Sequence, residues 1–164
     1  MITLFHGSYT TIDKPIATFG RKDLDFGLGF YVTKLRAQAE AWAKIVAGRK
    51  GPRAVPVLNI YELDLSNYPA DKLRLKSFEQ YDLEWLDFVV NCRDGGTDYV
   101  NYDIIEGGVA NDNVIDTVED YRNHIITAHQ ALGQLRYKKV NHQLCIVNQA
   151  VIDSCLRFIN SIHL

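Results

Sequence analysis

Two glycines stand just before a short aromatic and β-branched run in residues 24–33, and this stretch constrains the fold more than any other. Gly27 and Gly29 can adopt backbone conformations closed to other residues, and they admit close approach of another backbone or a ligand. The run that follows has strand character, and strand alternation puts the Tyr31 side chain on the face opposite its two neighbours. We expect a loop that holds the Tyr31 ring in a fixed place. A β-bulge or tight bend with a surface tyrosine is the alternative.

The chain opens with an apolar segment, residues 1–5, followed by the polar run His6, Gly7 and Ser8. This pattern predicts a short strand that ends in a turn. Functional side chains are frequent where a strand gives way to a glycine-containing loop. An imidazole can donate or accept a hydrogen bond, so His6 is a candidate ligand-binding group. The alternative is a histidine bonded to neighbouring backbone at the strand end.

Together these two motifs resemble the NAD-binding signature of the ADP-ribosyltransferase superfamily, in its histidine–tyrosine branch. In that branch, which includes diphtheria toxin and the poly(ADP-ribose) polymerases, the histidine holds the adenosine ribose and the tyrosine stacks on the nicotinamide. The resemblance therefore implies NAD as co-substrate, with His6 and Tyr31 in these roles. The residues to which it assigns NAD binding are His6, Gly7, Ser8, Gly27, Gly29, Tyr31 and Thr33.

Most of the chain also resembles an uncharacterised bacterial family from the same clan. The shared motifs are Asp-Phe-Gly-x-Gly-Phe-Tyr-x-Thr at 25–33, Glu-Trp-Leu-x-Phe at 84–88, Ile-x-Glu-Gly-x-x-Ala-x-Asp at 104–112, and His142-Gln143. This resemblance implies an ADP-ribosyltransferase-like fold, a split mixed β-sheet flanked by helices.

The third functional position departs from the superfamily pattern. Transferases of this kind usually carry a glutamate at the start of a late strand, where this chain has Gln143. A glutamine can hold a ribose hydroxyl, but it cannot take a proton or offset positive charge on the ribose. Either a carboxylate from elsewhere acts, with Glu106 and Asp112 as the catalytic candidates beside Gln143, or the chemistry is slow or absent. The alternative for residues 106–112 is a structural turn in which Asn111 and Asp112 serve as a helix N-cap. Asp25 is a weaker candidate, with a turn-capping role as its alternative.

The hydrophobic periodicity predicts an α+β domain. Strands are expected at residues 1–5, 30–33, 55–65, 99–105 and 140–147, and helices at 34–50, 78–93, 114–121, 127–135 and 148–160. Glu106 and the two glycines after it are expected to stop the fourth strand. A Rossmann fold is rejected because the strands and helices lack regular βαβ spacing and the Gly27-x-Gly29 motif does not open a helix.

The expected core includes both tryptophans, each on an apolar helical stripe. In the first helix the stripe is Ala37, Ala41 and Ile45 with Trp42 beside it; in the second it is Trp85, Leu86, Val89 and Val90. His142 is predicted to be structural, and His124 and His129 to lie at the surface. The last helix is expected to turn Val151, Ile152, Cys155, Leu156 and Ile159 inward.

Composition limits the class of protein. The length suits a single domain over 1–164, and the net charge of −2 makes no global case for nucleic-acid binding. Three cysteines at unrelated spacings predict buried thiols in a reducing compartment, and no metal site is expected. No segment is apolar enough to span a membrane or to act as an export signal, so a cytoplasmic protein without a membrane partner is expected.

The leading functional interpretation is a mono-ADP-ribosyltransferase that uses NAD to modify an unknown macromolecular acceptor, protein or nucleic acid. From the resemblance alone comes the expectation of a bacterial toxin or phage-defence factor paired with a small antitoxin protein. A glycohydrolase that cleaves NAD without transfer is one alternative. Another is a degenerate module that binds NAD, ADP-ribose or a partner protein without turnover, for which Gln143 is the main support.

Overall fold

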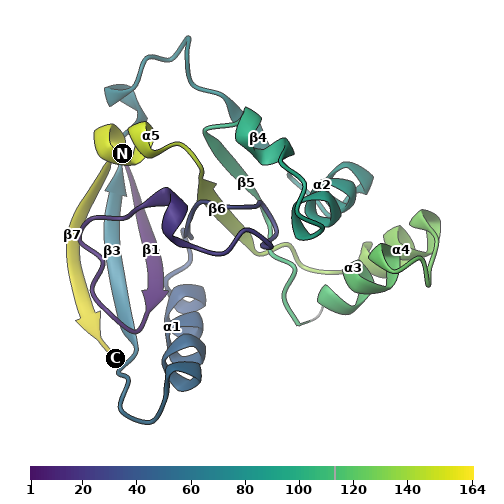
Figure 1. The fold of residues 1–164 in the computed structure, drawn as a ribbon, viewed down its shortest axis with the longest axis horizontal. Coiled ribbons are helices and arrows are strands. Elements are labelled where there is room, and N and C mark those ends of the chain that lie inside the picture. The colour runs from purple at the N-terminus through teal and green to yellow at the C-terminus, as the bar shows by residue number, and fades with distance from the viewer. Residues whose placement is uncertain (113) are drawn as a thin grey trace.

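In the computed structural model, which describes residues 1–112 and 114–164, the strands form two sheets (Figure 1). The first sheet is antiparallel, with β3 (Val57–Leu63) between β1 (Ile2–Ser8) and β7 (Leu156–His163). The second has the order β2-β6-β5-β4, built from β2 (Phe30–Val32), β6 (His142–Ile146), β5 (Ile104–Gly108) and β4 (Leu75–Ser77). Only the pair β4–β5 in this second sheet is parallel, so the sheet is mixed. The described residues thus form an α+β domain with a divided sheet.

The two sheets meet where β1 passes the free edge of β2. The contact is a single antiparallel bridge between Phe5 and Thr33. The Phe5 amide donates to the Thr33 carbonyl at 2.8 Å, and the Thr33 amide donates back to the Phe5 carbonyl at 2.9 Å. Because His6 follows Phe5 and Tyr31 lies two residues before Thr33, this bridge brings the two sequence motifs side by side.

Buried apolar side chains lie between the helices and the two sheets. Helix α1 (Arg36–Lys50) covers the first sheet, and α2 (Leu83–Arg93) lies against the second, next to the packed pair α3 (Ile115–Arg122) and α4 (Ala128–Leu135) (Figure 1). A core cluster with residues of both sheets also includes α5 (Gln149–Cys155). Single-turn 3₁₀ segments at Ala17–Phe19, Leu65–Asn67 and Asp98–Asn101 complete the described elements.

Helix α1 buries a face other than the predicted one. Ala39, Ala43 and Ala47 are buried, whereas Trp42 is 46% exposed and Ile45 is 45% exposed. The reason lies in the strand that the helix covers. A Cβ atom on Gly7 would stand 2.1 Å from the Ala39 carbonyl oxygen, so the helix backbone rests directly on the strand. Only small side chains fit such a contact, and the larger Trp42 and Ile45 point outward.

Helix α2 confirms its predicted core. Trp85, Leu86 and Val89 are buried, and Val90 is half-buried. The helix begins later than predicted, at Leu83, because the Asp82 side chain accepts a hydrogen bond from the Trp85 amide at 2.9 Å and caps its N-terminus.

The predicted helix over 148–160 is wrong in its second half. Helix α5 ends at Cys155, and the chain then runs as β7 along β3, with Leu156 opposite Leu63 and Ile162 opposite Leu58. Ile159, predicted to face inward, is 42% exposed. The apolar spacing is compatible with a continuous helix, but pairing with β3 satisfies the same backbone groups and decides the outcome.

Strand boundaries also shift around the predicted site. β1 continues through His6, Gly7 and Ser8, so these residues do not form a turn. Residues 98–101 form a 3₁₀ segment, and β5 runs from Ile104 to Gly108. Glu106 and the two glycines after it therefore lie inside a strand that they were predicted to stop.

The three cysteines are free and buried, as predicted. His124 and His129 are exposed, also as predicted. Among the helices of the described residues, none combines the length and apolar character needed to cross a membrane.

The buried thiols predict a loss of stability at alkaline pH. Burial raises the pKa of Cys145, and it raises that of Cys92 to about 12. A cysteine in the unfolded chain ionises at about pH 8.5, so below that pH the buried thiols contribute their full share to the free energy of unfolding. As the pH rises from there toward the folded pKa, this contribution is lost. We expect the urea-derived unfolding free energy to fall from about pH 8 to pH 10. In Cys92→Ala the fall should be shallower; an equal slope would contradict this assignment.

Candidate functional site

His6 bridges the two sheets. Its Nδ1 lies 2.6 Å from the Tyr31 carbonyl oxygen, and its ring stacks on Phe30 with centroids 4.7 Å apart. Since a carbonyl can only accept, Nδ1 carries the hydrogen and donates it. Burial lowers the pKa of His6, which the bond to Tyr31 partly offsets, so the ring is neutral at pH 7. Nε2 is then the remaining ring nitrogen, and it is a hydrogen-bond acceptor.

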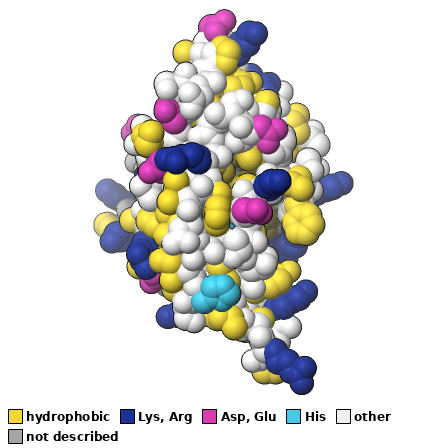
Figure 2. Space-filling model, turned by 90° about the vertical axis from the view of Figure 1, so that its left-hand side faces the viewer, with side chains coloured by type: hydrophobic (Ala, Val, Ile, Leu, Met, Phe, Trp, Pro, Cys, Tyr) yellow, Lys and Arg dark blue, Asp and Glu magenta, His cyan; other side chains and the backbone are white. Residues whose placement is uncertain are grey.

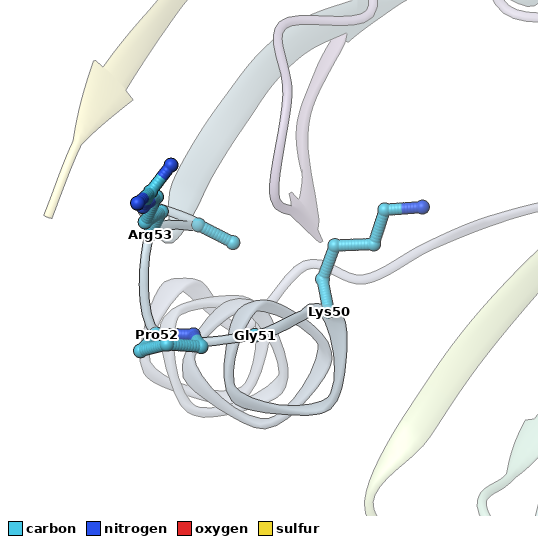
Figure 3. A pocket seen from close by; sticks show the side chains of 5 residues that line it. Lys50, Gly51, Pro52 and Arg53 are labelled. Carbon is cyan, nitrogen blue, oxygen red and sulfur yellow. The ribbon is translucent and has the colours of Figure 1, made fainter.

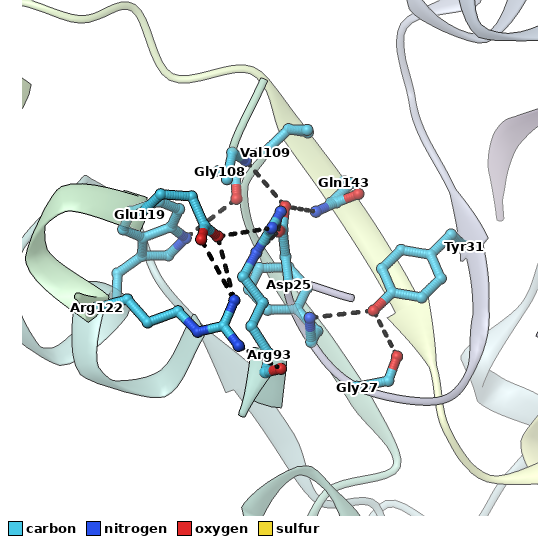
Figure 4. A network of polar contacts seen from close by, with 12 residues as sticks. Asp25, Gly27, Tyr31, Arg93, Gly108, Val109, Glu119, Arg122 and Gln143 are labelled. Carbon is cyan, nitrogen blue, oxygen red and sulfur yellow. Dashed lines mark hydrogen bonds and ion pairs between the residues drawn. The ribbon is translucent and has the colours of Figure 1, made fainter. Parts of the chain in front are cut away.

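Tyr31 lies in β2, and its hydroxyl closes the glycine loop. The hydroxyl donates to the Gly27 carbonyl at 2.7 Å and accepts from the Phe26 amide at 3.0 Å (Figure 4). Its ring packs against a different core cluster from Phe30 and Val32, which confirms the predicted alternation. Burial is the main cause that raises the pKa of Tyr31, so the phenol stays protonated at neutral pH. The Tyr31 ring and the His6 ring consequently lie on opposite sides of β2.

The loop glycines are required by packing within the protein. Gly27 has φ +73°, and a Cβ there would stand 2.2 Å from Cδ1 of Tyr99. At Gly29 an added Cβ would stand 2.3 Å from the Cys145 sulfur. The space beside both residues is therefore occupied by side chains of the same chain.

Ser8 and Thr33 are both buried near the sheet junction. The Thr33 hydroxyl donates to the His142 carbonyl at 3.1 Å and accepts from the Leu35 amide at 3.1 Å. It thereby connects β6 to the start of α1. The half-buried His142 takes part through its backbone, which agrees with its predicted structural role.

Gln143 shares a face of the second sheet with Tyr31. In β6 it stands opposite Gly107 of β5, and two residues further along the strand Cys145 stands opposite Tyr31. Side chains two apart on a strand point to the same face, so Tyr31 and Gln143 are diagonal neighbours. The Gln143 amide nitrogen donates to Oδ2 of Asp25 at 3.1 Å (Figure 4).

Asp25 is the centre of this network, and it does more than cap a turn. Its side chain is buried, and Oδ1 accepts from Nε and Nη2 of Arg93 at 3.0 and 2.6 Å. Oδ2 accepts from the Ala110 amide at 2.8 Å as well as from Gln143. One carboxylate thus joins the glycine loop, the end of α2, the segment after β5 and the start of β6.

The network extends outward through charged side chains on α3. Arg93 also contacts Glu119 at 3.4 Å, and Glu119 contacts Arg122 at 3.3 Å (Figure 4). Arg122 in turn pairs with Asp94 at 2.6 Å. Arg93 was not among the predicted site residues. An arginine in the last turn of a helix is ordinarily explained by the helix dipole, so its sequence position carried no signal of this role.

Two of the predicted carboxylates do not join this cluster. Glu106 stands opposite Leu144, so its side chain lies on the other face of the sheet from Gln143, where it pairs with Lys34 at 2.8 Å. Asp112 is exposed in the segment between β5 and α3. The N-cap residue of α3 is Val114, so the predicted N-cap role of Asp112 is wrong.

Two surface hollows among the described residues lie away from this cluster. One is at the turn after α1, lined by residues 50–54 (Figure 3). Another is lined by residues from β3, α5, β7 and the chain start, including Glu62, Asp153 and Arg157. On the face toward β7, cationic, anionic and apolar side chains are interspersed (Figure 2). Neither hollow includes a predicted site residue.

A family model matches residues 2–158, nearly the whole chain. Its description is "Protein of unknown function (DUF3990)". The chain belongs to this family. The match to DUF3990 runs from β1 into the first three residues of β7, and hence includes every residue of the cluster around Asp25. No curated protein and no solved structure matches the chain.

Proposed function

We propose that this protein is an NAD-dependent mono-ADP-ribosyltransferase whose site lies along the free edge of β2. The observation that carries the proposal is the common face of Tyr31 and Gln143, far apart in sequence and diagonal neighbours in the sheet. His6 adjoins them through the Tyr31 carbonyl. These are the three positions to which the resemblance assigns contacts with the nicotinamide and the two riboses.

The available atoms suit such a ligand. Nε2 of His6 can accept a hydrogen bond from a hydroxyl of the adenosine ribose. The Tyr31 ring can stack on an aromatic ring, and the Gln143 oxygen can accept from a hydroxyl of the second ribose. Because His6 and Tyr31 lie on opposite sides of β2, NAD would cross the edge of this strand. Within residues 1–112 and 114–164, the bridge at Thr33 is the one pairing of this edge with another strand.

Cleavage of a glycosidic bond proceeds through an oxocarbenium-like transition state. Gln143 can orient the ribose but cannot remove a proton from an acceptor. Acceptors that are already nucleophilic, such as a carboxylate, phosphate, thiolate or nucleobase nitrogen, therefore suit this site best. A role as an intracellular toxin or phage-defence factor, held in check by a small antitoxin, belongs to the same proposal and rests on the resemblance alone.

Binding of NAD is the first expected result. We expect Tyr31→Ala to weaken it by about 1–2 kcal/mol through lost stacking, and His6→Ala to weaken it as well. Tyr31→Phe separates ring from hydroxyl: it keeps the stacking surface and loses only the two bonds to the glycine loop. Tyr137→Ala, at a tyrosine that is 85% exposed, is the matched control. Calorimetry that finds wild-type binding in both alanine variants would refute the proposed site.

Turnover separates the proposed transferase from its alternatives. Nicotinamide release that rises when cell lysate is added indicates transfer, and equal release without lysate indicates hydrolysis. Binding without release indicates a non-catalytic module, which the glutamine at 143 favours. We expect Gln143→Ala to reduce release about tenfold or more, and Glu106→Gln to leave it within about twofold because Glu106 faces away. If Glu106→Gln abolished release while Gln143→Ala left it intact, the active carboxylate would be Glu106 on β5.

A further inference from the structure

The contact between Asp25 and Gln143 determines the orientation of the glutamine amide. An ionised carboxylate has only acceptor atoms, so the Gln143 group that faces Asp25 at 3.1 Å must be its NH₂. The amide oxygen then points the opposite way, and Figure 4 shows it on the side of Gln143 away from Asp25. The sheet face shared with Tyr31 is thereby given an acceptor oxygen in a defined place.

Asp25 is itself held firmly. Its two oxygens accept four hydrogen bonds, two from Arg93, one from the Ala110 amide and one from Gln143. The donors come from α2, from the segment after β5 and from β6, which are fixed by the core. With both oxygens engaged and the side chain buried, this carboxylate can act on a ligand only through a neighbour.

We propose that Asp25 is a positioning residue for Gln143, and that its fixed carboxylate makes a glutamine, instead of a glutamate, the compatible residue at position 143. A glutamate there would set a second carboxylate against Oδ2 of Asp25, where a donor is required. In this arrangement the negative charge of the site lies on Asp25 of the glycine loop, behind Gln143. Strand β6 carries a neutral hydrogen-bond acceptor, the Gln143 amide oxygen. The positioning role in turnover rests on the proposed transferase function; the pairing does not.

A charge-transposition cycle tests the pairing without any ligand. The variants are Asp25→Asn, Gln143→Glu and the double variant Asp25→Asn/Gln143→Glu, which exchanges amide and carboxylate. We expect Gln143→Glu to lower the melting temperature by about 4–10 °C, because two carboxylates meet in a buried place. The double variant should lose less melting temperature than the two single variants added together, because the introduced glutamate then faces an amide, while the cost of an uncharged side chain beside Arg93 and the Ala110 amide is common to both variants that carry Asp25→Asn. Gln134→Glu, at an exposed glutamine on α4, should stay within about 2 °C of wild type.

Steady-state nicotinamide release from NAD tests the positioning role. We expect Asp25→Asn to lower kcat about tenfold with KM for NAD within about twofold, and the double variant to regain most of the loss. A purely structural Asp25 would leave kcat per folded molecule unchanged. If Asp25→Asn does not fold, Gln143→Glu and the double variant carry the same comparison.

The outcomes are separable. If the double variant loses as much melting temperature as the two single variants added together, or more, the pairing is overturned. If the pairing holds, wild type is active and the exchange restores no turnover, the positioning role is overturned. Wild-type protein that neither binds nor cleaves NAD overturns the transferase function and the catalytic role of Asp25 with it, while the melting cycle still decides whether Asp25 selects glutamine at 143.

Discussion

Replacement of Trp85 by alanine is expected to destabilise the protein by about 3–5 kcal/mol. The side chain is fully buried on α2, and its ring meets Tyr81 edge-on with centroids 4.6 Å apart. Its indole nitrogen donates to the Gly108 carbonyl at 3.0 Å, so truncation leaves both a cavity and an unpaired carbonyl at the end of β5. Urea unfolding followed by circular dichroism measures the loss.

Trp42→Ala is the matched control for this experiment, since the residue type is the same and the helix α1 site is exposed. The guanidinium carbon of Arg49 lies 5.4 Å from the centre of the Trp42 ring. Because truncation removes a cation–π contact at the surface, we expect the free energy of unfolding to fall by no more than about 1 kcal/mol. Equal losses in the two variants would contradict the difference in burial between the helices.

Replacement of Arg93 by methionine is expected to cost about 3–5 kcal/mol, since it leaves the buried Asp25 carboxylate without its cationic partner. The pair is well shielded from solvent, with Asp25 7% exposed and Arg93 20% exposed at their side chains. Methionine keeps the apolar stem, so the change isolates the charge. Chemical denaturation at neutral pH measures the difference from wild type.

Arg36→Met provides the comparison on the surface. Arg36 pairs with Glu40 one turn away at 2.7 Å, but the two side chains are 53% and 31% exposed, so solvent screens the pair and the expected loss is at most about 1 kcal/mol. If Arg93→Met unfolded with no greater loss than Arg36→Met, Asp25 would have another source of compensation and its central place in the network would be wrong.

Sequence patterns predicted those elements whose burial follows apolar periodicity. Helix α2 is the clearest case, because Trp85, Leu86 and Val89 are large and regularly spaced. The same patterns gave wrong predictions where small residues, or pairing between strands far apart in the chain, decide the structure. The alanine face of α1 depends on Gly7 in another strand, and β7 depends on β3, a hundred residues earlier in the chain.

The candidate site was predicted in part for the same reason. Tyr31 and Gln143 were proposed from motifs, and the structure brings them to one face. Glu106 was proposed beside them, but whether two residues on paired strands share a face depends on register, which one sequence does not reveal. The partnership of Asp25 with Arg93 joins residues 68 positions apart and left no local signal in the sequence.

The order of strands in the second sheet has a consequence for synthesis on the ribosome. β6 lies between β2 and β5, yet it is the last of the four strands to be translated. Until residues 142–146 have emerged, β2 and β5 have no common neighbour and this sheet cannot assemble. A nascent chain therefore holds Tyr31 without Gln143 until β6 has been made, and whatever activity the cluster supports is withheld until that strand has emerged.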